Sequence, residues 1–399
     1  MPQLLTNEKF LKIFDIVEKL HGSAMVDRNE FEKKFGKTLY HSISKEDFEL
    51  EKQKVLKRLP KLSKNELAFE IYRLFALFKD AHTRLYPSSN FMDDDYVRKF
   101  LDLQLIELDN KFYVAGINKE NKNLLLQQVE AINDVPINLL VKKAKTMISA
   151  ETEQYKRINV FSNTNFKNAR FLEILGLEDV ENGVEITVDG KKYDVSYNTS
   201  FVKADLFKIP YFYGFERKDG IAFLGYYIAN EDKNYPIKKF CDDLKNNLQH
   251  GESVIIDLRN NPGGSSRYFD EIAKVLKEKE VVGCFLTNGG TFSAGTWAAM
   301  MCKKLGLVNV GEEWGEPTKR FGDCPNRTKI EELDLVFTVS EKYFDLNEAM
   351  DLPSATNKPE IEVHNSIEDL RKNFDRVLQT AISYIKNENH NESLCPNIK

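Results

Sequence analysis

Residues 287–295 join a short apolar run to a segment with helical spacing, and they place Ser293 at the junction. A serine in the first turn of a helix lies beside backbone N–H groups that have no partner within the helix, and the helix dipole favours negative charge there. An attacking hydroxyl and the oxyanion formed by its attack both require such surroundings. Serine is also a common helix N-cap, and this segment taken alone favours a simple cap.

Residues 257–264 form a second segment with chemical potential, Asp-Leu-Arg-Asn-Asn-Pro-Gly-Gly. It follows the apolar run 253–258, and open α/β sheets place their ligand sites at the carboxyl ends of such strands. The paired glycines Gly263 and Gly264 permit close backbone approach and leave N–H groups accessible. Taken alone, a tight turn between a strand and a helix explains the pattern slightly better.

The third segment is Lys-Asp-Ala-His-Thr-Arg-Leu at residues 79–85, directly after a predicted helix. Histidine is the side chain best suited to accept a proton from a hydroxyl at neutral pH and return it later, so His82 is a candidate general base. A histidine past the end of a helix is, in isolation, more often a cap for that end.

In combination and order, the three segments resemble the tail-specific (C-terminal processing) serine peptidase family, in its tricorn-core-like branch. Downstream segments extend the resemblance, which covers about residues 65–387: Val-Gly-Glu at 310–312, Phe-Gly at 321–322, Val-Phe-Thr-Val-Ser-Glu-Lys-Tyr-Phe at 336–344 and Pro-Glu-Ile-Glu-Val at 359–363. The chain departs from the family at Ala81, where glycine is usual, and at Pro262 within the glycine turn. Residues 313–317 replace the usual Pro-Thr-Gly-Gly.

The resemblance implies that Ser293 is the nucleophile and His82 its general base. The backbone N–H groups of Ala294 and of the turn at Gly263 and Gly264 would form the oxyanion hole. Metals and cofactors are not implied.

Two assignments stay open. The carboxylate that orients the histidine has no motif; Asp351 is preferred, with Glu348 and Asp345 as alternatives. The family's other branch uses a Ser–Lys dyad, and Lys319, 26 residues after Ser293, competes with His82 as the base. The Asp-x-His-Thr motif favours His82.

The last 190 residues predict an α/β domain, because short apolar runs alternate with helical segments, as in parallel sheets with crossover helices. The predicted strands are 221–228, 253–258, 281–286 and 307–310, and the predicted helices are 266–278, 294–304 and 366–387. The resemblance implies a ClpP/crotonase-like fold here.

The first half of the chain predicts helices followed by a β-rich module. Apolar spacing indicates helices at 8–20 and 66–78, the second opened by a capping box of Ser63 and Glu66. Hairpins are predicted around residues 109–110 and 189–190. The module falls where the family carries a PDZ-like domain. The predicted divisions are 1–94 (helical, carrying the base), 95–205 (PDZ-like), 206–390 (catalytic) and 391–399 (a polar tail).

Composition excludes several classes of protein. The 399 residues carry 57 basic and 62 acidic side chains, a net charge of −5 without a basic block, which argues against nucleic-acid binding. No run of about 18 apolar residues occurs, so membrane insertion is not expected. Charged residues interrupt the first 22 positions, which predicts a cytoplasmic protein, although an exported form that has lost its signal stays open. Five scattered cysteines predict neither disulfides nor a zinc site.

The sequence therefore predicts a serine endopeptidase that acts on peptides or unfolded proteins through an acyl-enzyme. An inactive peptide- or lipid-binding protein on the same scaffold is the alternative, and a crotonase-type acyl-CoA enzyme is a third reading. The oligomeric state, including a homo-oligomer, is left open.

Overall fold

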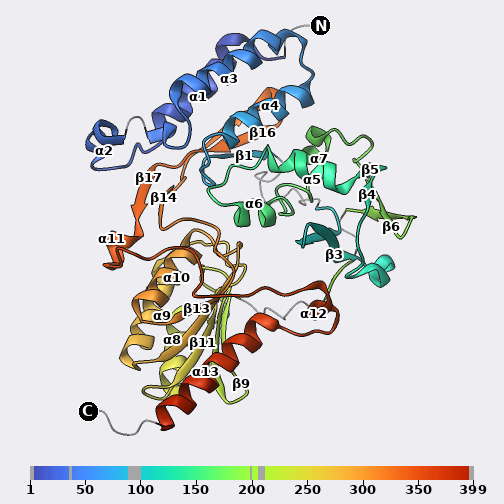
Figure 1. The fold of residues 1–399 in the computed structure, drawn as a ribbon. Helices are drawn as coiled ribbons and strands as arrows, with labels where there is room; N and C mark the ends of the chain where they lie inside the picture. The colour runs from blue at the N-terminus through green and yellow to red at the C-terminus, as the bar shows by residue number, and fades with distance from the viewer. Residues whose placement is uncertain (1–3, 36–37, 89–99, 198–199, 205–211, 395–399) are drawn as a thin grey trace. The chain divides into compact units, whose positions relative to one another are not determined.

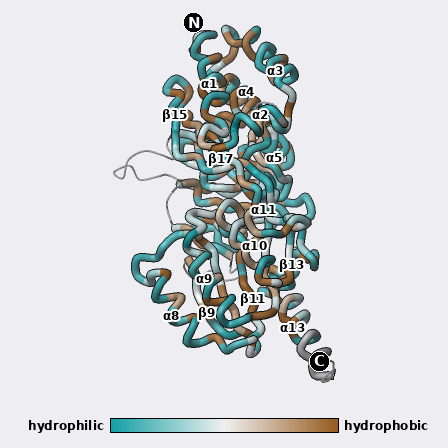
Figure 2. The backbone as a smooth tube through the Cα atoms, turned by 90° about the vertical axis from the view of Figure 1, so that its left-hand side faces the viewer, coloured by the Kyte–Doolittle hydropathy of each residue, from teal (hydrophilic) through white to brown (hydrophobic). Residues whose placement is uncertain are grey.

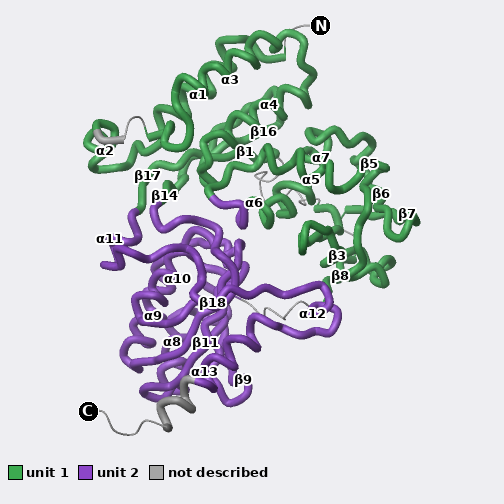
Figure 3. Tube along the Cα trace, in the orientation of Figure 1, with its two compact units in different colours: residues 1–151, 156–204, 320–344 green, residues 152–155, 205–319, 345–399 purple. Residues whose placement is uncertain are grey.

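The computed structural model describes residues 4–35, 38–88, 100–197, 200–204 and 212–394. The chain divides into two compact units (Figure 3). Unit 1 comprises Met1–Glu151, Lys156–Ala204 and Arg320–Phe344; unit 2 comprises Thr152–Tyr155, Asp205–Lys319 and Asp345–Lys399. Ser293 therefore belongs to unit 2 and His82 to unit 1.

Unit 2 is built on a six-stranded sheet in the order β18-β13-β12-β11-β10-β9. Five of these strands run parallel, and β9 pairs antiparallel with β10. The strands are β9 (Tyr213–Lys218), β10 (Ile221–Tyr226), β11 (Ser253–Asp257), β12 (Val282–Thr287), β13 (Val308–Gly311) and β18 (Ile361–Glu362). The four predicted strands and their parallel arrangement are confirmed, and the fold class is mixed α/β.

Helices cover both faces of this sheet (Figure 1). Side chains alternate along each strand: Ile255 and Leu286 pack against α13 with Ala381 and Ile382, whereas their strand neighbours point to the opposite face. The helices of unit 2 are α8 (Ile237–Asn247), α9 (Arg267–Glu278), α10 (Ala294–Lys304), α11 (Leu346–Met350), α12 (Ile367–Arg371) and α13 (Arg376–Leu394). Figure 2 shows hydrophobic residues, in brown, recurring along these strands.

The single helix predicted at 366–387 is wrong. Its start is right, because Ser366 and Asp369 form a capping box, but α12 ends at Arg371. Asn373 then takes a left-handed conformation with φ 51°, which no α-helix can continue. A new helix, α13, begins at Arg376 and extends to Leu394, into the predicted polar tail, whose last five residues lie outside the described ranges.

The N-terminal part of unit 1 is helical. Its helices are α1 (Asn7–Leu20), α2 (Arg28–Phe35), α3 (Lys45–Arg58) and α4 (Lys64–Ala76), with short 3₁₀ helices at Thr38–Tyr40 and Leu59–Lys61. The predicted capping box at the start of α4 is present. Phe14 contacts the rings of Phe10, Phe48 and Phe75, so aromatic side chains hold α1, α3 and α4 together.

The loop that follows α4 leads directly into a small antiparallel sheet. Its strand order is β1-β16-β15, formed by β1 (Arg84–Pro87), β15 (Arg327–Ile330) and β16 (Leu335–Thr338), with a 3₁₀ turn at Glu331–Leu333. A two-stranded pair, β14 (Lys319–Gly322) with β17 (Lys342–Asp345), lies where the chain passes between the units. Residues 320–344 thus supply strands to the unit that carries His82.

The rest of unit 1 contains both predicted hairpins. Its strands form two sheets, β2-β3-β8 and β5-β4-β6-β7. The elements are β2 (Leu103–Leu108), β3 (Lys111–Asn118), a 3₁₀ segment (Lys119–Leu124), β4 (Ala131–Ile132), β5 (Val135–Pro136), α5 (Ile137–Lys145), α6 (Glu153–Asn159, which begins in unit 2), α7 (Ala169–Leu175), β6 (Gly183–Val188), β7 (Lys191–Ser196) and β8 (Phe201–Lys203). The division of the chain at 94/95 and 205/206 stays a prediction. Within the described ranges, no helix has the length and apolar character needed to cross a membrane.

Candidate active site

Ser293 lies at the N-terminus of α10 in a strained backbone conformation. Its φ is 56° and its ψ is −117°, a region that costs an L-residue about 1–3 kcal/mol. Its side chain forms no capping hydrogen bond with the helix. The simple cap that the segment alone favoured is therefore not what the structure shows. Strained turns of this kind, between a strand and a helix, carry catalytic serines in other α/β enzymes.

The glycine turn lies directly against this serine. Gly263 has φ 95°, and a Cβ added to it would lie 2.5 Å from Ser293 Cβ and 2.9 Å from the Ala294 backbone nitrogen. Gly264 has φ 134°, and a Cβ there would overlap the carbonyl oxygen of Ala229. The structure thus brings Gly263 against Ser293 and Ala294, and Gly264 against Ala229. A side chain at Gly263 would prevent the approach to Ser293.

The backbone N–H groups of the turn differ in their availability. The Gly263 N–H donates to Asn261 Oδ1 at 2.9 Å. Among the described residues, the N–H groups of Gly264 and Ala294 donate to no protein acceptor. Of the three predicted oxyanion donors, Gly264 and Ala294 are therefore the two whose N–H groups remain for an oxygen of a substrate.

Asn261 connects the glycine turn to the loop that carries Ser293. Its backbone carbonyl accepts the N–H of Phe292 at 2.9 Å, and its side-chain amide donates to the Tyr226 carbonyl at 2.9 Å. It is fully buried. In the sequence Asn261 is only one residue of a motif, whereas in the structure it forms bonds to both loops and to the end of β10.

A buried ion-pair network anchors the turn on its other side. The Arg259 guanidinium donates to Asp257 at 2.7 Å and to Asp375, just before α13, at 2.8 Å. Burial alone would lower the pKa of Arg259, but the two carboxylates outweigh it and raise that pKa well above its ordinary value. The arginine stays charged, and the network ties β11 to α13 beneath the turn.

In unit 1, His82 lies on a loop organised by the carboxylate of Asp80. Asp80 Oδ1 accepts the backbone N–H of His82 at 2.9 Å, and Oδ2 accepts the hydroxyl of Thr83 at 2.6 Å. The His82 carbonyl accepts the hydroxyl of Thr338 from β16 at 2.8 Å. The side chain of His82 is buried, with 8% of the residue exposed. The bonds to Asp80 of its own motif and to Thr338 of β16 hold its loop in place.

Asp80 has a partner from α1 that the sequence did not reveal. His21 Nε2 lies 3.2 Å from Asp80 Oδ2, and both side chains are buried. Burial raises the pKa of the Asp80 carboxyl, but the hydrogen bond from His21 and the fields of His21 and His82 outweigh burial and hold that pKa well below its ordinary value. Asp80 is thus ionised at neutral pH and fixes the loop that carries His82.

The alternative base and the candidate acids all lie in unit 2. Lys319 Nζ is 2.7 Å from Asp345 Oδ2, and the lysine side chain is 55% exposed. Asp345 also caps α11 by accepting the N–H of Glu348. Glu348 is exposed, and Asp351 is an exposed residue that ends α11 with φ 58°. Asp345 is thus already engaged in an ion pair with Lys319 and in the N-cap of α11.

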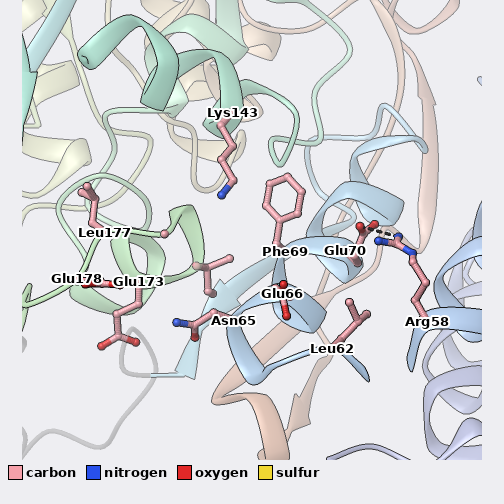
Figure 4. A pocket seen from close by; sticks show the side chains of 12 residues that line it. Arg58, Leu62, Asn65, Glu66, Phe69, Glu70, Lys143, Glu173, Leu177 and Glu178 are labelled. Carbon is pink, nitrogen blue, oxygen red and sulfur yellow. Dashed lines mark hydrogen bonds and ion pairs between the residues drawn. The ribbon is translucent and has the colours of Figure 1, made fainter. Parts of the chain in front are cut away.

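A separate pocket of about 320 Å³ lies in unit 1, between α4 and α7 (Figure 4). Arg58 is paired with Glu70 at 2.8 Å, and Lys143 donates to the Leu175 carbonyl at 2.7 Å while lying over the Phe69 ring. Both cations of the pocket are engaged with the protein itself. The sequence-predicted site residues all lie elsewhere.

Comparisons with known proteins give one sequence match and several structural ones. Residues 220–284 match the profile of Peptidase family S41. No curated protein sequence matches the chain.

The structure of mature CPAF aligns over 91% of this chain and 94% of that one, with 11% identity and a TM-score of 0.58. CPAF complexed with lactacystin aligns over 92% and 95%, with 12% identity and a TM-score of 0.56. The photosystem II D1 C-terminal processing protease aligns over 90% and 94%, with 12% identity and a TM-score of 0.45. The CPAF matches show a shared fold.

We expect Gly263→Ala to destabilise unit 2 by about 2 kcal/mol or more, because the new methyl group meets Ser293 in a left-handed backbone. Urea unfolding followed by tryptophan fluorescence measures the change, since Trp297 and Trp314 both lie in unit 2. Gly251→Ala is the matched control, because Gly251 has φ 70° with open space around it and should lose only about 1 kcal/mol. Equal losses in the two variants would contradict the close approach.

We expect Asp80→Asn to lower the free energy of unfolding at pH 7 by at least about 1 kcal/mol, with the difference shrinking below about pH 4. A carboxyl whose pKa falls on folding stabilises the fold above its ordinary pKa, and this contribution is lost as the pH falls toward the folded value. Urea unfolding from pH 3 to pH 7 measures it. Asp179→Asn, at an exposed carboxylate of the same unit, is the control. A deficit that does not change with pH would contradict the assignment.

Proposed function

We propose that this chain, whose residues 220–284 match peptidase family S41, is a serine-type peptidase that hydrolyses protein substrates through an acyl-enzyme on Ser293. The supporting observation is the arrangement at the start of α10. Ser293 is held in a strained turn, its side chain makes no cap to the helix, and Gly263 lies against it. The N–H groups of the adjoining residues Ala294 and Gly264 are available. Attack on a peptide carbonyl moves negative charge onto its oxygen, and these two donors would stabilise that charge.

His82 is the proposed general base. It would take the Ser293 proton during attack and return it to the leaving amine. Lys319 is the weaker candidate, because a lysine accepts a proton only when it is neutral, and an exposed lysine paired with Asp345 favours the charged form. Support for His82 comes from its own unit, where Asp80, Thr83 and Thr338 fix its loop.

Asp351 remains the proposed third member, with Glu348 and Asp345 as alternatives. Asp80 accepts the backbone N–H of His82 and so positions the loop that carries the imidazole. The tie between Asp345 and Lys319 makes Asp345 the least suitable of the three candidates.

The finer fold assignments are part of the same proposal. We assign residues 206–390 to a ClpP/crotonase-like domain, which the parallel sheet of unit 2 supports, and residues 95–205 to a PDZ-like module. Such a module would bind an extended peptide by adding it as a strand to a sheet edge, and β2 and β8 are edge strands. The tricorn-core-like branch and a cytoplasmic location complete the proposal.

We expect Ser293→Ala to abolish cleavage of unfolded casein and labelling by a fluorophosphonate probe, with a loss of about 10⁴-fold or more. Ser266→Ala is the matched control, because Ser266 is the N-cap of the neighbouring helix α9 and also makes no side-chain capping bond. That variant should cleave like the wild type. If Ser293→Ala cleaves casein as fast as the wild type, Ser293 is not the nucleophile. A wild-type protein that binds peptides without cleaving them would favour the alternative of an inactive binding protein.

We expect His82→Ala to lose at least about 10³-fold in kcat, whereas Lys319→Ala stays within about threefold of the wild type. The kcat of the wild type should fall as the pH drops below the range in which an imidazole is neutral. Rates of peptide cleavage between pH 5 and pH 9 test both expectations. The opposite pattern, an inactive Lys319→Ala and an active His82→Ala, would assign the chain to a Ser–Lys mechanism.

A further inference from the structure

Glu316 is a fully buried carboxylate in the loop between β13 and β14, and it reaches the start of α10. Its Oε2 accepts the backbone N–H of Ser293 at 2.6 Å and the hydroxyl of Thr296 at 3.1 Å. Both donors lie in the first turn of the helix, where the helix dipole favours a negative charge. At 2.6 Å, the bond from the Ser293 N–H is a short one for an N–H donor.

The loop that carries Glu316 is fixed by contacts of its own. The Gly315 N–H donates to the Thr291 carbonyl at 2.9 Å, and the Gly315 carbonyl accepts the hydroxyl of Thr152 at 2.8 Å. A Cβ on Gly315 would lie 2.6 Å from the Gly289 carbonyl oxygen, so the two loops are in close contact. The carboxylate of Glu316 is therefore held at a defined place relative to Ser293.

Three other serines of this chain show the usual N-cap geometry, from which Ser293 departs. Ser44, Ser63 and Ser366 are N-caps with extended backbones, φ −66° to −82°, and the side chain of each accepts an N–H of its own helix. A serine hydroxyl used in this way is not available as a nucleophile. Ser293 differs in that its backbone is left-handed and its side chain makes no such bond.

The two capping boxes contain a similar bond between a carboxyl group and the N–H of the N-cap serine. In them, Glu66 and Asp369 accept the N–H of the capping serine from the third position of the same helix. The third position of α10 is Thr296, which has no carboxylate. Glu316, 23 residues after Ser293, takes the Ser293 N–H instead and also binds Thr296.

We propose that Glu316 is the positioning residue of the nucleophile: it holds the Ser293 backbone in the conformation that keeps the hydroxyl off the helix. This inference rests on the proposed function. It also has a consequence for the oxyanion hole. Because the Ser293 N–H is bound to Glu316, it cannot serve as an oxyanion donor, and the hole consists of the Ala294 and Gly264 N–H groups.

Glu316→Ala tests the proposal. We expect a fall in kcat of about 10²-fold with KM within about threefold, because a displaced nucleophile slows the chemical step and leaves peptide binding unchanged. The rate of fluorophosphonate labelling of Ser293 should fall by a similar factor. Glu316→Gln, whose amide oxygen can still accept the Ser293 N–H, should recover at least tenfold of the kcat lost in Glu316→Ala.

Thr296→Val is the matched control, because it removes the other bond to the same carboxylate oxygen and leaves the bond to Ser293. Thr296→Val should keep kcat within about threefold of the wild type, even if its melting temperature falls as much as that of Glu316→Ala. If Thr296→Val and Glu316→Ala lose the same amount of kcat for the same loss of melting temperature, the positioning role is overturned. If Glu316→Ala does not fold, Glu316→Asp carries the test, since it keeps the charge on a shorter side chain; wild-type kcat in Glu316→Asp overturns the proposal.

Ser293→Ala, measured beside these variants, separates the two hypotheses. An inactive Ser293→Ala with a fully active Glu316→Ala overturns the positioning role alone. Cleavage by Ser293→Ala at the wild-type rate, or a wild-type protein that neither cleaves casein nor takes up the probe, overturns the proposed function and the positioning role with it.

Discussion

Two loops that leave neighbouring parallel strands must lie in van der Waals contact for the candidate site to exist. β11 and β12 pair in parallel, so the glycine turn and the loop that carries Ser293 emerge at the same edge of the sheet. Only glycine at position 263 allows the first loop to approach the second so closely, and Gly264 allows the same turn to lie against Ala229. The available N–H groups, the strained serine and the bonds of Asn261 between the loops all depend on this approach.

Buried carboxylates hold both halves of the proposed machinery, and each has defined partners. Asp257 and Asp375 share the Arg259 guanidinium under the glycine turn. Asp80 organises the His82 loop, and Glu316 binds the first turn of α10. A buried charge without partners would be costly, so each acid also fixes the geometry of the groups that satisfy it. Because of these bonds, the loops that carry His82 and Ser293 can hold a buried side chain and a strained backbone in place without belonging to a regular helix or strand.

Local pattern predicted most of the regular structure, and the resemblance to a known family supplied the members of the candidate site. Neither revealed the residues that support that site. Strands such as β11 and β12 and the helix α10 follow from runs of apolar residues, and the capping box of α4 follows from Ser63 and Glu66. The sequence did not predict the break between α12 and α13. Asparagine is tolerated within helices, and the residues next to Asn373 do not require its left-handed conformation. Residues 313–317 were noted only as a departure from a family pattern, although they contain Glu316.

By itself the sequence determined which elements form and which residue types could do chemistry, because apolar periodicity, caps and glycine pairs act between residues close together in the chain. The tertiary structure alone decided the partners: His21 for Asp80, 59 residues away, Asp375 for Arg259, 116 residues away, and Glu316 for Ser293, 23 residues away. Such contacts leave no periodic signal. They are set by how the elements pack, and packing brings together side chains whose separation along the chain carries no information about their distance in space.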